Sequence, residues 1–190
     1  ISSTAWDAHC VQPDLERLRE WAPALKCNVD GWLAKYDSDG DGLLEVDSHW
    51  WTGMEWQPSF FYFTGFDRNN DKGHLERVDL TAYVYGDAKN LARICDAIGD
   101  EEGTKKYSGI ANKIRVAVQG SMWDQDTHFF YSIDPRDGRK ALVKEIVGVY
   151  PFYFGMFPSG EADYVQEWRS IVDPAEFWTP WPVASATKKC

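Results

Sequence analysis

One carboxylic acid in this chain lies in surroundings that suit acid catalysis. Glu55 is in the segment Gly53–Pro58, and Trp50 and Trp51 closely precede that segment. Apolar rings around a carboxyl group disfavour its charged form, so the group can keep a proton near neutral pH and donate it. An unselected glutamate is more often a solvated loop residue, and the tryptophans could equally be core residues. The neighbourhood favours a general acid beside rings that could hold a sugar.

A group of acidic residues lies just upstream of Glu55. Asp37, Asp39, Asp41 and Glu45 occupy positions one, three, five and nine of a run that has glycine at position six. This spacing matches the first nine positions of a calcium-binding EF-hand loop. The twelfth position, where a bidentate glutamate should close the shell, is Ser48. The run therefore predicts either a structural calcium site or a tight acidic turn that ends a helix.

Other metal and cofactor motifs are weak or absent in the sequence. The segment 67–71 repeats the acidic alternation, but Lys72 stands where the glycine should be, so a solvated turn is favoured there. The four histidines share no spacing typical of zinc ligands. No nucleophile-elbow, P-loop or dinucleotide-binding glycine motif is present, which disfavours serine hydrolases, phosphoryl transfer and nicotinamide chemistry.

Composition and charge limit the class of ligand. The 190 residues carry a net charge of −10, and their lysines and arginines form no basic stripe, so nucleic acid is not an expected partner. No apolar run reaches the roughly 20 residues that span a bilayer, so a membrane is not expected either. Ten Trp, nine Tyr and ten Phe exceed the needs of a helical core, and some should line a cleft. An uncharged oligosaccharide or glycoside fits best.

The elements that must position these residues are mainly helices. Apolar residues recur at steps of three and four, and the helices they predict cover residues 13–36, 75–98, 101–118 and 161–172. The second and third helices are joined so tightly at Gly99 that they must be antiparallel. Residues 127–148 predict a short β-hairpin that turns at 135–138. The expected fold is all-α, with helical hairpins separated by long aromatic-rich connections.

The sequence GMEWQPSFF after DSDGDGLLEVDSHWW resembles the acid-bearing loop of inverting glycoside hydrolases with an (α/α)6 barrel. The similar families are the trehalases, the family 63 processing glucosidases and the mannosylglycerate hydrolase-like enzymes. In these families a Gly-hydrophobic-Asp-x-x-Pro turn supplies the proton donor. The resemblance implies that Glu55 is the general acid, although this chain has Glu where the families commonly have Asp. It also implies part of an (α/α)6 toroid, with no required cofactor.

The same resemblance nominates residues that contact the sugar. Connections before alternate helices form the active-site face of such barrels, and the segments that begin at Ser121, Val147 and Phe177 match the group in order. The implied substrate-binding residues are Trp51, Trp56, Gln57, Trp123, Asp124, Tyr150, Trp178 and Trp181. For each of them the alternative is core packing, or a turn-capping role for Asp124. Asp79 could bond a sugar hydroxyl or pair with Arg77.

An inverting reaction needs a second carboxyl group, about 6.5–9.5 Å from the acid, to activate water. In the similar families this base is a Glu late in the barrel, after the region resembling FWTPWPVAS. We therefore expect residues 1–190 to be a single but incomplete catalytic domain, with the rest of the parent chain as its partner. The predicted function is hydrolysis of a glycosidic bond. The alternatives are a non-catalytic carbohydrate-binding or scaffold protein, and a calcium-regulated interaction protein.

Overall fold

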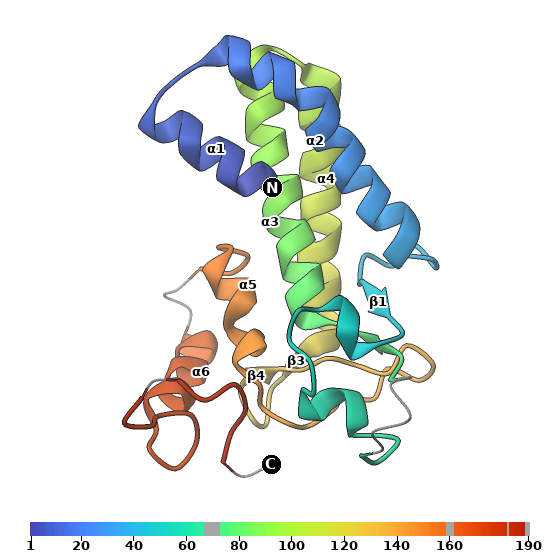
Figure 1. Cartoon of the computed structure of the whole chain (residues 1–190), viewed down its shortest axis with the longest axis vertical. Coiled ribbons are helices and arrows are strands. Elements are labelled where there is room, and N and C mark those ends of the chain that lie inside the picture. The colour runs from blue at the N-terminus through green and yellow to red at the C-terminus, as the bar shows by residue number, and fades with distance from the viewer. Residues whose placement is uncertain (67–72, 159–161, 182, 189–190) are drawn as a thin grey trace.

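The computed structural model describes residues 1–66, 73–158, 162–181 and 183–188. Its long helices lie side by side, and the long connections gather at one end of the molecule (Figure 1). α3 is central, because it packs against α4, α1, α2 and α5. The helices are α1 (Ser2–Val11), α2 (Leu15–Tyr36), α3 (Val78–Ile98), α4 (Glu101–Ala117), α5 (Tyr150–Tyr153) and α6 (Ala162–Val172).

The predicted helices are confirmed, with their ends fixed by capping groups. The side chain of Asp14 accepts a hydrogen bond of 2.9 Å from the backbone N–H of Arg17, so α2 begins at Leu15. The side chain of Asp100 accepts a hydrogen bond of 3.0 Å from the backbone N–H of Gly103 and caps α4 in the same way. Gly99 has a φ of 80°, a conformation that glycine adopts without strain, and it turns the chain from α3 into α4.

The helix predicted for 75–98 begins three residues later than expected. Residues 75 and 76 instead form β2 (Leu75–Glu76), which pairs antiparallel with β1 (Glu45–Val46). The register places Glu45 opposite Glu76. The pairing was not predicted, and neither were α1 and α5. It matters for the site because it brings the acidic run beside the start of α3.

The predicted turn at 135–138 is present, and Ile133 bridges Lys140 across it. A second hairpin, which was not predicted, lies just before it, where β3 (Trp123–Asp124) pairs antiparallel with β4 (Phe129–Phe130). A π-helical turn (Val118–Met122) leads from α4 into β3. Three 3-10 turns, His49–Trp51, Pro58–Phe61 and Ile146–Val149, complete the connections.

Most buried apolar residues form one core around α3, and a smaller cluster contains Phe129, Tyr131 and Phe177. Many of the aromatic residues are therefore structural. The weak acidic repeat at 67–71 lies outside the described residues. Within the described part of the chain, no helix is long and apolar enough to cross a membrane.

Candidate active site

Glu55 lies in a turn between the 3-10 helices His49–Trp51 and Pro58–Phe61, which we call the acid turn (residues 52–57). His49 holds its first half. The backbone carbonyl of His49 accepts a hydrogen bond of 2.9 Å from the Thr52 hydroxyl, and His49 Nδ1 accepts one of 3.4 Å from the backbone N–H of Trp56. His49 is buried, and its ring lies 4.4 Å from that of Trp50 and 4.7 Å from that of Trp56.

The backbone of Trp56 has an unusual conformation. Its φ is 66°, a left-handed value that costs a bulky residue free energy unless its surroundings fix it. The ring of Trp56 stacks on Phe61 at an interplanar angle of 13° and a centroid distance of 6.2 Å. This packing and the contact with His49 hold the peptide that follows Glu55. These contacts therefore fix the backbone of the acid turn next to Glu55.

The second half of the acid turn is anchored in a buried polar network. Glu145 accepts hydrogen bonds from both the backbone N–H (2.8 Å) and the hydroxyl (2.9 Å) of Ser59. Arg77 donates to the Ser59 hydroxyl at 2.5 Å and to the side-chain oxygen of Gln57. Gln57, Ser59, Arg77 and Glu145 are all buried. Burial raises the pKa of Glu145, and the positive charge of Arg77 opposes that rise.

Arg77 is the centre of this network. Every N–H of its guanidinium group has an acceptor, on Asp79, Gln57, Ser59 or Glu145. Its Nε and one terminal nitrogen bind the two carboxylate oxygens of Asp79 at 3.0 and 3.1 Å. The remaining N–H groups reach Gln57, Ser59 and Glu145. Its side chain is 0% exposed. A fully paired arginine of this kind holds its partners in a fixed geometry.

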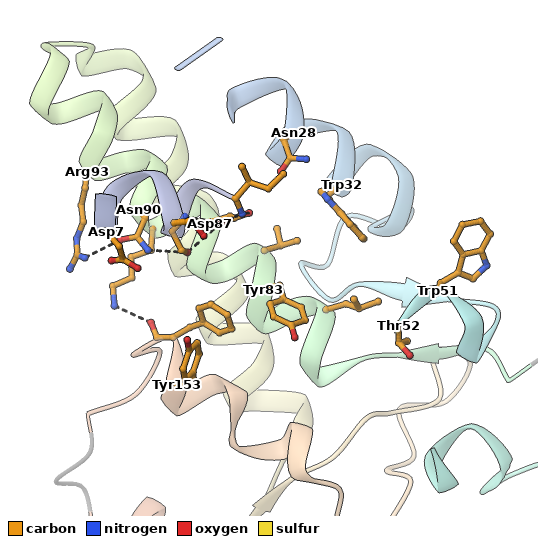
Figure 2. Close-up of a pocket in the computed structure, with 17 residues that line it drawn as sticks. Asp7, Asn28, Trp32, Trp51, Thr52, Tyr83, Asp87, Asn90, Arg93 and Tyr153 are labelled. Carbon is orange, nitrogen blue, oxygen red and sulfur yellow. Dashed lines mark hydrogen bonds and ion pairs between the residues drawn. The ribbon is translucent and has the colours of Figure 1, made fainter. Parts of the chain in front are cut away.

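A cavity of about 710 Å³ lies beside the acid turn (Figure 2). Trp51 and Thr52 line it at one end, and Tyr83 of α3, Trp32 of α2 and Tyr153 of α5 contribute aromatic rings. Polar side chains also line the cavity, among them Asp7, Asn28, Asp87, Asn90 and Arg93. Its size and its mixture of rings and polar groups suit a small polar ligand such as a sugar.

The structure separates the predicted site residues into different roles. Glu55 is exposed and does not line the cavity, so the expected enclosure of its carboxyl group by rings is not formed. Trp51 lines the cavity. Trp56 packs within the turn, and its residue remains 44% exposed. Gln57 lies in the turn, where it is buried and accepts a hydrogen bond from Arg77, and its contact with a sugar stays a prediction.

The other predicted contacts lie apart from the acid turn. Trp123 packs on Phe130, with ring centroids 4.7 Å apart, and Asp124 accepts hydrogen bonds from the Thr127 backbone and hydroxyl. Tyr150 packs on Tyr83, 5.5 Å between centroids, and so supports one wall of the cavity. Trp178 and Trp181 are exposed in the C-terminal segment. Asp79 has the structural role, as the partner of Arg77.

Three members of the predicted calcium set come together. One carboxylate oxygen each from Asp37, Asp39 and Asp41 lies within 4.8 Å of the others. Glu45 is not part of this group, because its carboxylate contacts the Ser38 hydroxyl at 3.1 Å and His74 Nε2 at 3.1 Å. Glu45 as a calcium ligand stays a prediction, because its carboxylate lies outside the group of three and is bonded to Ser38 and His74.

Glu76 is the acidic residue that the sequence did not indicate. Its residue is 3% exposed, and its Oε2 has no hydrogen-bond partner among the residues that the structure describes. Burial, with the negative charges of Asp41, Asp39, Glu45 and Asp37, raises the pKa of Glu76 to about 8. The ammonium group of Lys113 also lies at the loop, where it binds the carbonyl oxygen of Gly40.

Sequence reasoning also missed His49, Ser59 and Glu145 as parts of the site. The contact between Ser59 and Glu145 joins segments 86 positions apart, so no local pattern points to it. Arg77 carried the one usable signal, its spacing of two from Asp79 at a helix start, which allowed a paired role as one of two alternatives.

Comparison with known proteins identifies the fold. A sialidase matches 97% of this chain and 16% of its own length, with a TM-score of 0.79 at 23% identity. The family 63 mannosylglycerate hydrolase from Thermus thermophilus, solved with glucose, matches 97% of this chain and 57% of its own, with a TM-score of 0.76 at 15% identity. The neutral trehalase Nth1 from Saccharomyces cerevisiae matches 72% and 28%, with a TM-score of 0.51 at 13% identity.

These matches confirm the expected all-α fold of helical hairpins in the toroid group. The chain spans less than two thirds of the length of each of these three proteins. The family model for the mannosylglycerate hydrolase MGH1-like glycoside hydrolase domain matches residues 1–190. The chain belongs to this family of glycoside hydrolase domains.

Proposed function

We propose that the protein containing this chain hydrolyses a glycosidic bond by inversion, with Glu55 donating a proton to the departing oxygen. The observation that carries this proposal is the acid turn, whose two halves are held by His49 and by Arg77 while Glu55 projects from between them. A turn that buried residues hold on both sides, and whose carboxyl group is exposed, suits a residue that must reach a substrate. Family membership supports the same reaction class.

In this mechanism the acid and the sugar occupy adjoining positions. Trp51 and Thr52 connect the cavity to the acid, because they line the cavity and lie within four residues of Glu55. A sugar ring in the cavity would place its glycosidic oxygen at the end where Thr52 lies. As that bond breaks, the proton of Glu55 passes to the leaving oxygen, and a second carboxylate takes a proton from the attacking water. We assign that base to the part of the toroid beyond this chain.

The substrate class is an oligosaccharide or a small glycoside. The cavity offers Trp32, Tyr83 and Tyr153 for stacking, and carboxylate and amide groups for hydroxyl hydrogen bonds. The similar Thermus hydrolase is a mannosylglycerate hydrolase, so mannosides are the first sugars to test, followed by glucosides and β-L-arabinofuranosides.

The test uses the complete protein with the α-mannosyl, α-glucosyl and β-L-arabinofuranosyl fluorides. Proton NMR of the first product formed reports the anomer. We expect turnover of one of these sugars with inverted configuration, and a product with retained configuration would contradict the mechanism. No turnover of any sugar would favour the alternative, a carbohydrate-binding or scaffold protein, which is motivated by the exposed Glu in place of the usual Asp.

No cofactor takes part in this chemistry, but we propose a structural calcium ion at the acidic loop. Asp37, Asp39 and Asp41 would supply three oxygens. Glu76 lies outside that group of three, but their charges act on its buried carboxyl group, and we propose it as the ligand that replaces the missing twelfth-position glutamate. Carboxylate oxygens are the ligands that Ca²⁺ prefers. The buried, unpaired oxygen of Glu76 supports this fit, because such an oxygen needs a partner. Calorimetric titration of the protein with calcium tests the proposal, and an absence of both heat and thermal stabilisation would contradict it.

A further inference from the structure

The buried arginine at the start of α3 has more contacts than a helix start needs. Arg77 already satisfies its backbone N–H with the carbonyl oxygen of Leu44, at 2.8 Å, and its charge with Asp79. Asp79 alone could neutralise the guanidinium group. The remaining three N–H groups nevertheless point at Gln57, the last residue of the acid turn, and at Ser59 and Glu145, which hold the chain just after it.

The network is rigid where it meets the acid turn. Glu145 binds both the backbone N–H and the hydroxyl of Ser59, so the first turn of the helix Pro58–Phe61 cannot rotate without breaking two hydrogen bonds. Phe60 lies under the guanidinium group, with 4.6 Å between Arg77 Cζ and the ring centroid. Glu145 is itself fixed by its bridge to Ala186.

The link to Glu55 is short and runs through one residue. Gln57 is two positions after Glu55, and its side-chain oxygen accepts from Arg77. Trp56, between them, has a left-handed φ of 66° that needs both neighbours fixed. On the other side His49 holds the turn through contacts of 2.9 Å and 3.4 Å, and Trp56 also stacks on Phe61. Loss of the Gln57 contact would therefore free the peptide that carries Glu55.

We infer that Arg77 and Gln57 are positioning residues for the acid: their contact sets the direction of the Glu55 carboxyl group, and this inference rests on the proposed function. Neither residue touches the substrate. Catalytic geometry is sensitive to displacements of about 1 Å, which can cost on the order of 100-fold in rate. Breaking the contact should therefore reduce proton donation without abolishing sugar binding.

The test compares two substrates of one sugar in the complete protein, a glycosyl fluoride and the methyl glycoside. Fluoride leaves without full protonation, whereas the methoxy group needs a proton from the enzyme. The variant Gln57→Met removes the oxygen that Arg77 binds and keeps a side chain of similar length. We expect kcat to fall at least about tenfold more on the methyl glycoside than on the fluoride. Equal losses on both substrates, or no loss, would overturn the inference.

A matched control is Gln119→Met, which removes a single hydrogen bond, 3.0 Å from Gln119 Nε2 to the Tyr164 hydroxyl, away from the acid turn. Its ratio of the two rates should equal that of the unchanged protein. If Gln57→Met does not fold, the same two rates are measured for Ser59→Ala, which removes the hydroxyl that joins Arg77 to Glu145. Ser59→Ala should show the same preference for the fluoride, and an unchanged ratio would overturn the inference.

The two proposals fail differently. If Glu55→Gln shows the fluoride preference and Gln57→Met does not, only the positioning role is wrong. If Glu55→Gln itself loses both substrates equally, the assignment of the acid is wrong and the positioning role falls with it. In the double variant, Gln57→Met should add no further preference for the fluoride, since no acid is left to position.

Discussion

Glu45 and Glu76 are paired across β1 and β2, but their carboxyl groups have opposite environments. Glu45 contacts Ser38 and His74, whereas Glu76 is buried and one of its oxygens has no hydrogen-bond partner within the described ranges. The two residues differ in burial because Glu76 also bridges Ile133 and lies at the start of the core. The same substitution at these two positions therefore makes a matched pair for the calcium proposal.

We predict that Glu76→Gln weakens calcium binding by about tenfold or more, whereas Glu45→Gln leaves it within about twofold of the unchanged protein. Titration calorimetry gives both affinities, and the rise in melting temperature with added calcium gives an independent value. Equal weakening by the two variants would mean that general negative charge, and not a ligand at Glu76, attracts the ion.

The Lys113 ammonium group offers a competing explanation for the acidic loop, because it already lies against the Gly40 carbonyl and 3.9 Å from Asp37. We predict that Lys113→Met tightens calcium binding, since it removes a nearby positive charge. Isothermal titration at low and high salt measures the effect, which should shrink at high salt. If calcium binding weakened in this variant, the ion would not occupy the loop.

Substitutions at two helical glycines, Gly86 in α3 and Gly109 in α4, test the packing of α5 and Phe154 against α3. A Cβ atom at Gly86 would lie 2.3 Å from Phe154 Cδ1, whereas one at Gly109 would meet nothing within 4 Å. We predict that Gly109→Ala stabilises the fold by roughly 0.5–1 kcal/mol. Gly86→Ala should destabilise it by about 1–3 kcal/mol, because Phe154 must move. Urea unfolding of both variants gives the comparison, and equal stabilisation would contradict the packing of α5 on α3.

Glu167 gives a prediction for pH. Its carboxyl group is buried in α6, and neither oxygen has a hydrogen-bond partner in the described part of the chain. Burial raises its pKa well above the ordinary 4.5, although the charge of Lys144 opposes the rise. The folded chain keeps a proton that the unfolded chain releases above pH 4.5. Stability from this group is therefore complete below pH 4.5 and is lost as pH rises through the folded-state pKa.

Glu167→Gln removes that titration. We expect the unfolding free energy of the variant to fall less between pH 5 and pH 8, with a difference of about 1.4 kcal/mol for each unit of raised pKa. Chemical unfolding at several pH values measures it. Glu20→Gln, at an exposed position of α2, should keep the original pH dependence. An unchanged slope in Glu167→Gln would contradict the assignment.

The sequence was sufficient for α2, α3, α4 and α6, because their signals are local, but not for α1 and α5. The apolar stripe of α2 and the caps at Asp14 and Asp100 each involve residues within a few positions of one another. The pairing of β1 with β2 could not be read in this way. It joins two-residue strands about 30 positions apart, and each strand is too short to show an alternating pattern.

The candidate site also has parts that the sequence shows locally and parts that depend on distant contacts. The acid turn and the acidic run were visible as motifs. Its supports were not, because Glu145 reaches Ser59 across 86 positions and Arg77 reaches Gln57 across 20. Residue type alone does not separate two roles for Gln57, because an amide can bind a sugar hydroxyl or, when buried beside Arg77, anchor the turn. Burial, which decides between these roles, depends on contacts across the whole fold.

The central claim is that Glu55 protonates the leaving oxygen, and the direct measurement is the turnover of Glu55→Gln on a methyl glycoside and a glycosyl fluoride of the same sugar. The account predicts a loss of about 10²–10⁴ in kcat on the methyl glycoside and a much smaller loss on the fluoride. Equal rates for Glu55→Gln and the unchanged protein on the methyl glycoside would contradict it.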